Sequence, residues 1–427
     1  MALVPASPRS PALCDSSLVE IARRFGTPTY VYDLDAMSEG ARALLAAFGS
    51  PAQHGAHLVA YAVKANAAGP ILRRFAELGL GADVVTGPEL SLARASGIPA
   101  RRIVFSGVAK TDSELRLAVT EDIMAIQVES LGELRRLAAI ASTMGRVARV
   151  SIRINPGLDD LDTHAHVRTG HDEAKFGVAL GRLSLLTELA AATPSVQLVG
   201  VACHVGSQFA TTREYLEGAR IVMDVAARIA ASVPLEFVDA GGGFGIDYGG
   251  RPCAAPEDFV RAALEEKARR PELAAVALHV EPGRCLVGAH GVLLAQVIGD
   301  KTDGERRWMM IDAGMNDLMR PALYQAEHRI EAVREAASGE SARASYRVVG
   351  PICESSDDFG ARELPEPPPP FVVIRDAGAY GYTMASRYNG RALAAEVFVS
   401  GGVVVAACER EPEDAWVRSR LAFSAPG

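Results

Sequence analysis

The sequence predicts a (β/α)8 TIM barrel followed by an antiparallel β domain, and three observations carry this prediction. Between residues 58 and 283, short β-rich apolar runs alternate with longer segments of helical period. The apolar runs number eight, as a closed barrel requires. After about residue 285 the pattern changes to β-branched runs joined by Asp-Gly and Gly-Gly turns.

The predicted barrel strands are nearly continuous in hydrophobicity, as expected of parallel strands whose outer side is covered by helices. In chain order they are LVAYAVK, GADVVT, IVFSG, IMAIQVES, RVSIRIN, LVGVACHVG, LEFVDAGGG and AVALHVEPG. The β domain is predicted from VLLAQVIGDKTDGERRWMMIDAG, RASYRVVGPIC, FVVIRDAGAY and AEVFVSGGVVVAAC. We assign residues 36–284 to the barrel, and residues 1–35 together with 285–427 to the β domain.

Composition narrows the class of partner. The 427 residues are 49% hydrophobic, and 44 Lys and Arg stand against 52 Asp and Glu, so no basic surface for nucleic acid or anionic lipid is predicted. The N-terminal segment MALVPASPRSPALC has three prolines and no unbroken apolar core, unlike a signal peptide. The six cysteines form no CxxC pair, which argues against a zinc site or a disulfide framework. We expect a cytoplasmic protein that binds a small molecule.

A polar side chain stands at or near the C-terminal end of each predicted barrel strand. In a closed barrel these ends meet at one rim, where enzymes of this architecture build their active sites. Titratable groups gathered there therefore favour chemistry at this rim. The residues are Lys64, Asp83, Ser106, Glu129, Arg153, His204, Asp239 and Glu281.

Lys64 ends the apolar run HLVAYAVKAN, and its position alone leaves two interpretations open. The ammonium can reach the rim while its stem stays buried, with no role in chemistry. Alternatively, a partly desolvated amine beside other charges forms a Schiff base with a carbonyl, as in aldolases and pyridoxal phosphate enzymes. A phosphate-binding element near Lys64 would favour the pyridoxal phosphate enzymes.

Three motifs after the later strands are typical of such an element. DAGGGFG, residues 239–245, offers backbone N–H groups without side-chain obstruction, although a tight turn would have the same composition. EPGR, residues 281–284, follows the eighth strand, where barrels often bind phosphate. HVGSQ, residues 204–208, adds a hydroxyl and a flat ring. The candidate residues are His204, Ser207, Gly241, Gly242, Gly243, Gly283 and Arg284.

Glu281 supplies the electronic argument. Pyridoxal phosphate withdraws electrons well only when its ring nitrogen carries a proton, and a nearby carboxylate stabilises that pyridinium. A lysine, a glutamate, a ring that can stack and a phosphate cradle together predict a pyridoxal 5'-phosphate site.

The motifs YAVKAN, HVGSQ, GGGFG, EPGR, GPICESSD and GAYGYTMASRYN, in this order, resemble those of fold-type III pyridoxal phosphate-dependent decarboxylases, most closely the diaminopimelate decarboxylase family. The resemblance runs across almost the whole chain. It implies a barrel of alanine-racemase type, a β domain that carries substrate and dimer-interface residues, and a head-to-tail homodimer with shared active sites.

The resemblance also implies roles for individual residues around the cofactor. Lys64 would hold pyridoxal phosphate as an internal aldimine, Asp83 would position that lysine, His204 would stack on the ring, and Glu281 would pair with the pyridinium. The phosphate would be surrounded by Ser207, Gly241, Gly242, Gly243, Gly283, Arg284 and Tyr388.

Substrate and proton delivery are implied in the same way. Cys353 would donate a proton after carbon dioxide leaves, and Glu354 would hold the distal ammonium, both presented by the second subunit. Cys353 alone would otherwise be read as an inert thiol. Arginine suits a carboxylate because its planar fork binds two oxygens. The distal carboxylate would be recognised by Arg320 and Tyr324 with Arg284, and Tyr388 would contact the substrate as well.

The implied reaction is decarboxylation of meso-2,6-diaminopimelate at its D centre, through an external aldimine, to L-lysine and carbon dioxide, a step of lysine biosynthesis. Two departures keep the substrate open: YNGRALAAEV, residues 388–397, replaces the common YNSRPRPAEV, and Ser356 stands where glycine is frequent. The alternatives are a related decarboxylase acting on lysine, ornithine, arginine or a natural-product precursor, and a non-catalytic B6-binding protein. Glu281 argues against an alanine racemase, which typically places arginine at the ring nitrogen.

The segment GLDDLDTHAHVRTGHDEAKFG, residues 157–177, contains three histidines, His164, His166 and His171. No acidic or thiol partner stands at ligand spacing, so we expect a solvated loop rather than a metal site. The sequence does not indicate whether this loop touches the substrate.

Overall fold

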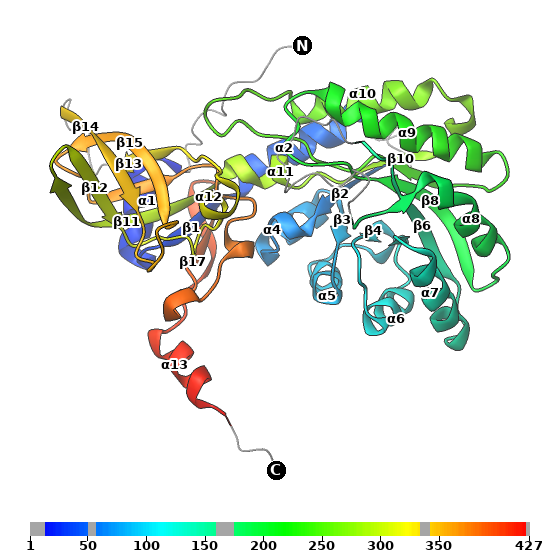
Figure 1. Ribbon diagram of the computed structural model, residues 1–427, viewed down its shortest axis with the longest axis horizontal. Helices are drawn as coiled ribbons and strands as arrows, with labels where there is room; N and C mark the ends of the chain where they lie inside the picture. The colour runs from blue at the N-terminus through cyan, green and yellow to red at the C-terminus, as the bar shows by residue number, and fades with distance from the viewer. Residues whose placement is uncertain (1–12, 50–56, 159–174, 334–341, 424–427) are drawn as a thin grey trace. The chain divides into compact units, whose positions relative to one another are not determined.

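The computed structural model describes residues 13–49, 57–158, 175–333 and 342–423. Its chain forms two compact units, each described here by itself (Figure 1). Of the described residues, unit 1 comprises 38–49, 57–158, 175–246 and 252–286, and unit 2 comprises 13–37, 247–251, 287–333 and 342–423. The short segment 247–251 therefore belongs to unit 2, although unit 1 residues precede and follow it in the sequence.

Unit 1 contains a closed parallel barrel. Its strands pair in the order β5-β4-β3-β2-β10-β9-β8-β6, and β5 pairs with β6 to close the ring, which confirms the predicted (β/α)8 barrel. A two-residue strand, β7 (Val178–Ala179), extends the edge of β6. The eight barrel strands are β2 (Leu58–Ala62), β3 (Gly81–Val84), β4 (Ile103–Phe105), β5 (Ala125–Val128), β6 (Ala148–Asn155), β8 (Val196–Cys203), β9 (Phe237–Asp239) and β10 (Ala277–Val280).

Helices α4 to α10 connect the barrel strands and lie outside the ring (Figure 1), while α2 precedes the first barrel strand and α11 follows the last. Several of them begin at a capping side chain, which satisfies a backbone N–H that the first helical turn leaves open. The Thr86 and Ser130 side chains accept from the amides of Glu89 and Glu133. The helices are α2 (Leu34–Ala47), α4 (Gly69–Glu77), α5 (Gly87–Ala95), α6 (Asp112–Glu121), α7 (Leu131–Thr143), α8 (Leu183–Ala191), α9 (Thr212–Ala230), α10 (Pro256–Ala268) and α11 (Arg284–Val287).

The barrel strands are buried along almost their whole length, because neighbouring strands and helices cover both of their faces. Every pairing in the ring is parallel, so all C-terminal strand ends meet at one rim. This rim carries the polar residues that the sequence placed at the strand ends.

Unit 2 is built on a mixed, mostly antiparallel sheet. Its main path runs β15-β14-β12-β11-β1-β17-β18, and β16 pairs with β11 and β13. The Asp-Gly and Gly-Gly turns join β11 to β12 and β17 to β18, as predicted. The strands are β1 (Thr29–Asp33), β11 (Gly291–Asp303), β12 (Arg306–Ile311), β13 (Ile330–Val333), β14 (Ala342–Val349), β15 (Asp358–Glu366), β16 (Phe371–Ile374), β17 (Ala395–Ser400) and β18 (Val403–Cys408).

Within the described part of unit 2, two strand pairings are parallel, which the prediction of an antiparallel domain did not include. β1 pairs with β17, and β12 pairs with β14, in parallel. A hairpin turn can make only antiparallel neighbours, whereas β1 and β17 come from opposite ends of the chain and no turn fixes their direction.

The core of unit 2 joins residues from both ends of the chain. Apolar side chains of α1 (Asp15–Phe25) pack with those of β1, β11 and β17. The unit also contains the short helix α12 (Arg320–Tyr324) and the C-terminal helix α13 (Glu413–Leu421), which has no buried residue. Among the described residues, no helix is long and apolar enough to cross a membrane.

Candidate active site

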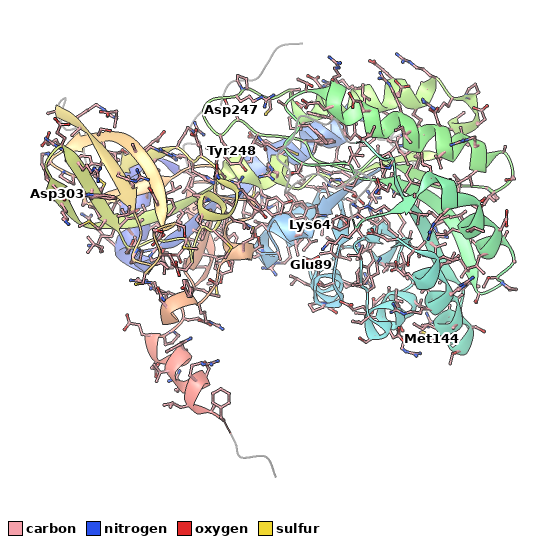
Figure 2. All side chains as sticks on the ribbon, in the orientation of Figure 1. Lys64, Glu89, Met144, Asp247, Tyr248 and Asp303 are labelled. Atoms are coloured by element: carbon pink, nitrogen blue, oxygen red, sulfur yellow. The ribbon has the colours of Figure 1, made fainter. Side chains whose placement is uncertain are left out.

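Lys64 lies directly after β2, in the single turn Val63–Ala65. Its ammonium contacts the carboxylate of Asp83, at the end of β3. The Lys64 side chain keeps 36% of its surface exposed, whereas Asp83 is fully buried (Figure 2). The barrel therefore holds this amine by a buried anion and leaves it accessible, as a Schiff-base lysine requires.

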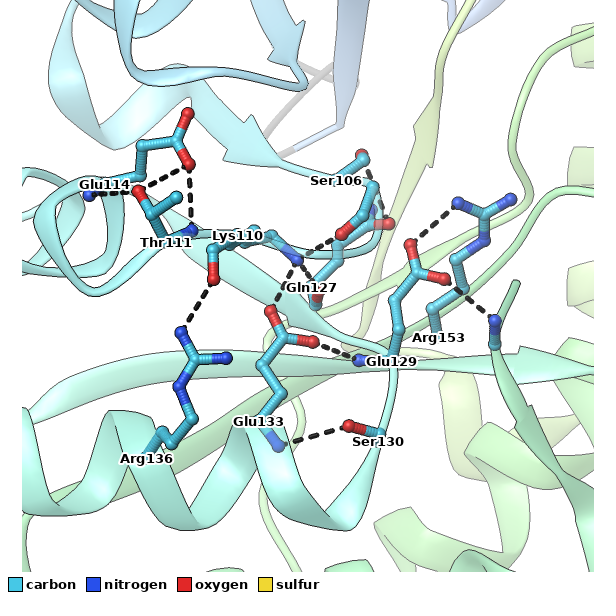
Figure 3. A network of polar contacts seen from close by, with 12 residues as sticks. Ser106, Lys110, Thr111, Glu114, Gln127, Glu129, Ser130, Glu133, Arg136 and Arg153 are labelled. Carbon is cyan, nitrogen blue, oxygen red and sulfur yellow. Dashed lines mark hydrogen bonds and ion pairs between the residues drawn. The ribbon is translucent and has the colours of Figure 1, made fainter. Parts of the chain in front are cut away.

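Lys110 provides a contrast from the same rim. Its ammonium donates to the carbonyls of Gly107 and Gln127, at 2.6 and 2.7 Å, and to Glu133 at 2.8 Å (Figure 3). Only 1% of its side chain is exposed. The three ammonium donors are thus occupied by three acceptors, which makes Lys110 a structural residue.

Glu281 lies immediately after β10 and is 7% exposed. The amide nitrogen of Gln127 donates to Glu281 Oε1 at 2.9 Å and to Asp239 Oδ2 at 3.2 Å. The Glu281 and Asp239 carboxyl groups also hydrogen bond to each other. Gln127 therefore bridges two buried carboxyl groups from different strands.

Burial sets the protonation of this pair. Desolvation raises the pKa of Glu281 well above its usual value, and the charges of Asp239 and Asp83 raise it further. Desolvation also raises the pKa of Asp239 to about 6, against the lowering effect of the Gly241 amide. The pair consequently keeps a proton in the cofactor-free chain.

Ser106 connects the lysine side of the site to the glutamate side. Its hydroxyl donates to Asp83 Oδ1 and lies 3.3 Å from Gln127 Oε1. Farther along the rim, Arg153 donates to Glu129 at 3.0 Å, and the Gly177 amide donates to the other Glu129 oxygen at 2.8 Å (Figure 3). The rim is a connected polar network rather than a set of separate charges.

His204 follows β8, and the Gly242 amide donates to its Nδ1 at 3.2 Å. An acceptor at Nδ1 means that a neutral ring carries its proton on Nε2. Desolvation lowers the pKa of His204 well below its usual value, and the Arg153 and Lys64 charges lower it further. The imidazole is therefore neutral, which suits a ring that stacks on an aromatic cofactor.

The glycine turn after β9 admits no side chain. A Cβ on Gly241, which has φ +70°, would collide with the Cys203 carbonyl, and one on Gly242 would collide with the Glu281 carbonyl. The first amide of this turn is fixed because Gly241 N–H donates to Asp239 Oδ1 at 2.9 Å. The turn is therefore a rigid backbone surface, as an anion cradle requires.

The remaining barrel candidates lie on the same strand ends. Arg284 is 8% exposed, and its Nη2 donates to Ser207 Oγ at 3.1 Å. A Cβ on Gly283 would lie 3.1 Å from the Cβ atoms of Ala62 and Ala65, which flank the Lys64 turn. A buried guanidinium beside a hydroxyl and a glycine turn fits a phosphate group.

The candidates of unit 2 form two groups. Tyr388 OH donates to Glu354 Oε1 at 2.5 Å, and the Cys353 amide donates to Asn389 Oδ1 at 3.1 Å, so Cys353, Glu354 and Tyr388 lie together and exposed. Arg320 and Tyr324 stand at the two ends of α12. Arg320 is 6% exposed, whereas Tyr324 is half-buried.

Sequence reasoning missed several residues that the structure brings to these sites. Gln127 is an amide inside the apolar run IMAIQVES, and this break in the pattern was its only signal. Glu89, whose pKa burial raises, accepts from the Val85 amide at 2.8 Å close to Lys64 and Asp83 (Figure 2). In unit 2, His328 and Tyr248 contact Arg320, and no motif marked either of them. The histidines His164, His166 and His171 lie outside the described residues.

Residues 38–288 match the family model described as the pyridoxal binding domain of pyridoxal-dependent decarboxylases. The chain belongs to the pyridoxal-dependent decarboxylase family. This finding confirms the predicted cofactor, pyridoxal 5'-phosphate, and the predicted class of enzyme.

Relatives and solved structures are similar to this chain over nearly its whole length. A diaminopimelate decarboxylase of Zymomonas mobilis is 41% identical over 404 residues, which are 93% of this chain and 94% of the relative. A solved diaminopimelate decarboxylase of Helicobacter pylori, complexed with L-lysine, is 34% identical with a TM-score of 0.87, over 94% of this chain and 99% of that one. The enzyme of M. jannaschii, in co-complex with L-lysine, is 34% identical with a TM-score of 0.88, over 96% and 94%.

The barrel rim fits the cofactor of this family. It offers an accessible lysine, a neutral imidazole, a buried carboxyl pair and a glycine turn beside Arg284 and Ser207. Each of these matches one part of pyridoxal phosphate: the aldehyde, the ring face, the ring nitrogen and the phosphate.

Proposed function

We propose that this decarboxylase converts meso-2,6-diaminopimelate to L-lysine and carbon dioxide, acting at the D centre, and thereby serves lysine biosynthesis. The observation that carries the proposal is the barrel rim with its accessible Lys64, found in a chain whose relatives over nearly full length are diaminopimelate decarboxylases. Relatives solved with L-lysine support the expected product.

Within the barrel, each residue has a separate task. Lys64 would hold the cofactor aldehyde and could carry a proton at Nζ, while Asp83 keeps the amine in place. Glu281 would hold the ring nitrogen of the cofactor, and His204 would hold its ring by stacking. Pyridoxal phosphate, when bound, supplies the electron sink that makes loss of carbon dioxide feasible.

The far end of the substrate is recognised by charge. The Arg320 guanidinium, with Tyr324 and Arg284, binds the distal carboxylate, and Glu354 binds the distal ammonium. Tyr388 serves both phosphate and substrate. The Cys353 thiol then delivers the proton that replaces the lost carboxylate.

The direct test is carbon dioxide release from a panel of amino acids. We expect meso-diaminopimelate to be turned over, with little release from the LL and DD isomers, L-lysine, L-ornithine or L-arginine. Turnover of L-lysine or L-ornithine in preference to meso-diaminopimelate would overturn the assigned substrate. Bound cofactor without carbon dioxide release from any member would overturn the enzymatic function.

We propose that the protein works as a homodimer in which Cys353 and Glu354 act in the site of the other subunit. Exposed apolar side chains of unit 2 support an interface, since Val403 and Val405 on the edge strand β18 are 62% and 52% exposed, and α13 has no buried residue. The Tyr388–Glu354 bond joins residues with roles in both subunits' sites. We propose that this bond is exchanged when the dimer forms.

Mixing two inactive variants tests this shared site. Lys64→Ala and Cys353→Ala should each be inactive alone, and random association of equal amounts should restore about a quarter of the unmodified activity per site. Co-purification of the two variants, each with a different affinity tag, provides the control that mixed dimers form. A mixture that stays inactive while mixed dimers form would show that Cys353 acts within its own chain.

We also propose that the protein is cytoplasmic. All six cysteines are free thiols in the structure, and such thiols persist in a reducing compartment. Fractionation of cells, with the protein followed by antibody, tests this location.

A further inference from the structure

We propose that His328 and Tyr248 are positioning residues that hold the Arg320 guanidinium, and that they thereby set the preference for ligands with a distal carboxylate. The inference rests on the proposed function insofar as Arg320 is assigned to that carboxylate. Neither His328 nor Tyr248 was marked by any sequence motif.

Two contacts, with Tyr248 and His328, fix the plane of the buried Arg320 guanidinium. Arg320 is the first residue of α12 and is 6% exposed. Its charge therefore needs compensation within the protein. The guanidinium carbon lies 4.6 Å from the centroid of the Tyr248 ring, in cation–π contact. Its Nη1 lies 2.8 Å from His328 Nε2.

The hydrogen bonds of His328 define one tautomer. Nδ1 lies 2.8 Å from the Arg375 carbonyl oxygen, which only accepts, so Nδ1 carries the proton. Nε2 of the neutral ring then has a lone pair, and it accepts from the guanidinium, which only donates. His328 is 3% exposed, and its own carbonyl accepts from Arg362 Nη2 at 2.9 Å. The acceptor that faces Arg320 is therefore fixed on both sides.

Tyr248 lies in the short segment 247–251, beside Asp247 (Figure 2). Asp247 Oδ1 accepts from the amides of Gly249, Gly250 and Arg251 at 2.6, 2.9 and 3.2 Å. The Tyr248 ring also packs edge-on against His328, with centroids 5.3 Å apart and planes at 77°. Each of Tyr248, His328 and Arg320 thus contacts the other two.

This arrangement orients the guanidinium rather than neutralising it. A guanidinium has five N–H donors, and the bond to His328 uses one of them. A neutral imidazole and an aromatic face carry no negative charge, so these two contacts orient the guanidinium without neutralising it. The geometry therefore holds a charged fork, and a misplacement of about 1 Å in such a fork can cost roughly 100-fold.

The test compares two ligands that differ by one carboxylate. L-lysine keeps the carboxylate at the centre that the proposed reaction leaves untouched, whereas 1,5-diaminopentane lacks it. Affinities of both ligands for the cofactor-loaded protein are measured by calorimetry, so the ratio needs no turnover. The inference can therefore fail while meso-diaminopimelate is still decarboxylated. It can also hold when the protein releases no carbon dioxide.

The informative variants come in matched pairs. His328→Asn keeps a group near the Nδ1 position but removes the acceptor for Arg320, whereas His328→Gln places an acceptor near the Nε2 position. Tyr248→Leu removes the aromatic face, whereas Tyr248→Phe keeps it. We expect the preference for L-lysine to fall about 10-fold or more in the Asn and Leu variants. The Gln and Phe variants should retain most of it.

Arg320→Ala and Ser400→Ala complete the set. Arg320→Ala should abolish the preference, and Ser400→Ala, which removes a 2.7 Å bond to Asp35 elsewhere in unit 2, should not change it. The inference is overturned if the preference survives in His328→Asn and Tyr248→Leu while Arg320→Ala removes it. It is also overturned if Arg320→Ala leaves the preference intact. Thermal unfolding of each variant shows whether it is folded. If a His328 or Tyr248 variant is unfolded, the variants at the other position test the inference.

Discussion

The barrel and the β unit hold their candidate residues in opposite ways. At the barrel rim, Asp83 and Asp239 are fully buried and Glu281 is 7% exposed, all within one hydrogen-bonded network. In unit 2, Cys353 and Glu354 are exposed, and Tyr388 is 44% exposed. The barrel candidates are thus enclosed in a hydrogen-bonded network, whereas these three candidates of unit 2 are exposed.

The two regions differ because of the elements that carry them. Each barrel strand is hydrogen bonded to a parallel neighbour on both sides, so the strand ends lie at fixed distances from one another. The residues Cys353, Glu354 and Tyr388 lie in turns between strands, where fewer backbone bonds fix their position. The contrast predicts that substitutions in the barrel network change cofactor binding and that substitution of the exposed Cys353 changes the rate alone.

The largest effect is expected from Lys64→Ala. Loss of the accessible amine should lower carbon dioxide release by roughly 1,000-fold or more. Lys301→Ala, on the exposed end of β11, should leave the rate unchanged. Borohydride reduction of the loaded protein and peptide mapping should place the cofactor on Lys64. A label on the enclosed Lys110 would break the distinction drawn between these two lysines.

The next effect is expected from Cys353→Ala. Removal of a general acid should lower kcat about 100-fold, while cofactor affinity and absorbance stay as in the unmodified protein. Cys408→Ser, which also alters an exposed thiol of unit 2, is the matched control and should change neither quantity. Weaker cofactor binding in Cys353→Ala would contradict the division of tasks between the two units.

A smaller effect is expected from Gln127→Met. The substitution keeps the approximate volume but removes the donor shared by Glu281 and Asp239, so cofactor affinity should fall about 10-fold. Titration of the cofactor-free protein with pyridoxal phosphate, followed by absorbance, measures this change. Gln197→Met alters an exposed glutamine of β8 and should have no effect. Equal affinities of both variants would show that the bridge does not support the site.

The smallest effect on activity is expected from Glu396→Gln, which should change only stability. Burial raises the pKa of Glu396 from 4.5 to about 7, despite the lowering effect of its bond from Tyr32 OH. Between these values the folded protein binds the proton more tightly than the unfolded chain, so its stability falls as the pH rises.

Glutamine cannot ionise, and Glu396→Gln should therefore lack this fall, which is at most about 1.4 kcal/mol per pH unit. Thermal unfolding between pH 4 and 8 measures the slope, with the difference between the proteins growing upward from about pH 4.5. Parallel unfolding curves of variant and unmodified protein across this window would contradict the raised pKa.

Much of the barrel could be predicted from the sequence because its signal repeats. Each apolar run of the first region became a parallel strand, and the polar residue at its end reached the common rim. The location of Lys64, Asp83 and Glu281 at the rim could be predicted because the strand ends of a barrel converge. The family motifs then added tasks for residues such as Tyr388 and Cys353, which no periodicity marks.

What escaped prediction depends on contacts between distant positions. Gln127 reaches Asp239 and Glu281 across the barrel, and nothing at position 127 indicates which side chains face it. Tyr248 lies between two barrel segments in the sequence but packs in unit 2, and no sequence pattern indicates this. The parallel pairing of β1 with β17 joins the two ends of the chain and was missed for the same reason.

The bonds from Gly241 through Asp239 and Gln127 to Glu281 bear on how easily this scaffold can evolve a new reaction. Racemisation favours a cation at the ring nitrogen, but an arginine at position 281 would lose the carboxyl hydrogen bond and face the donor of Gln127. Asp239 would have to rearrange as well, and it fixes the glycine turn. A change of reaction type at position 281 therefore requires substitutions at several hydrogen-bonded positions together.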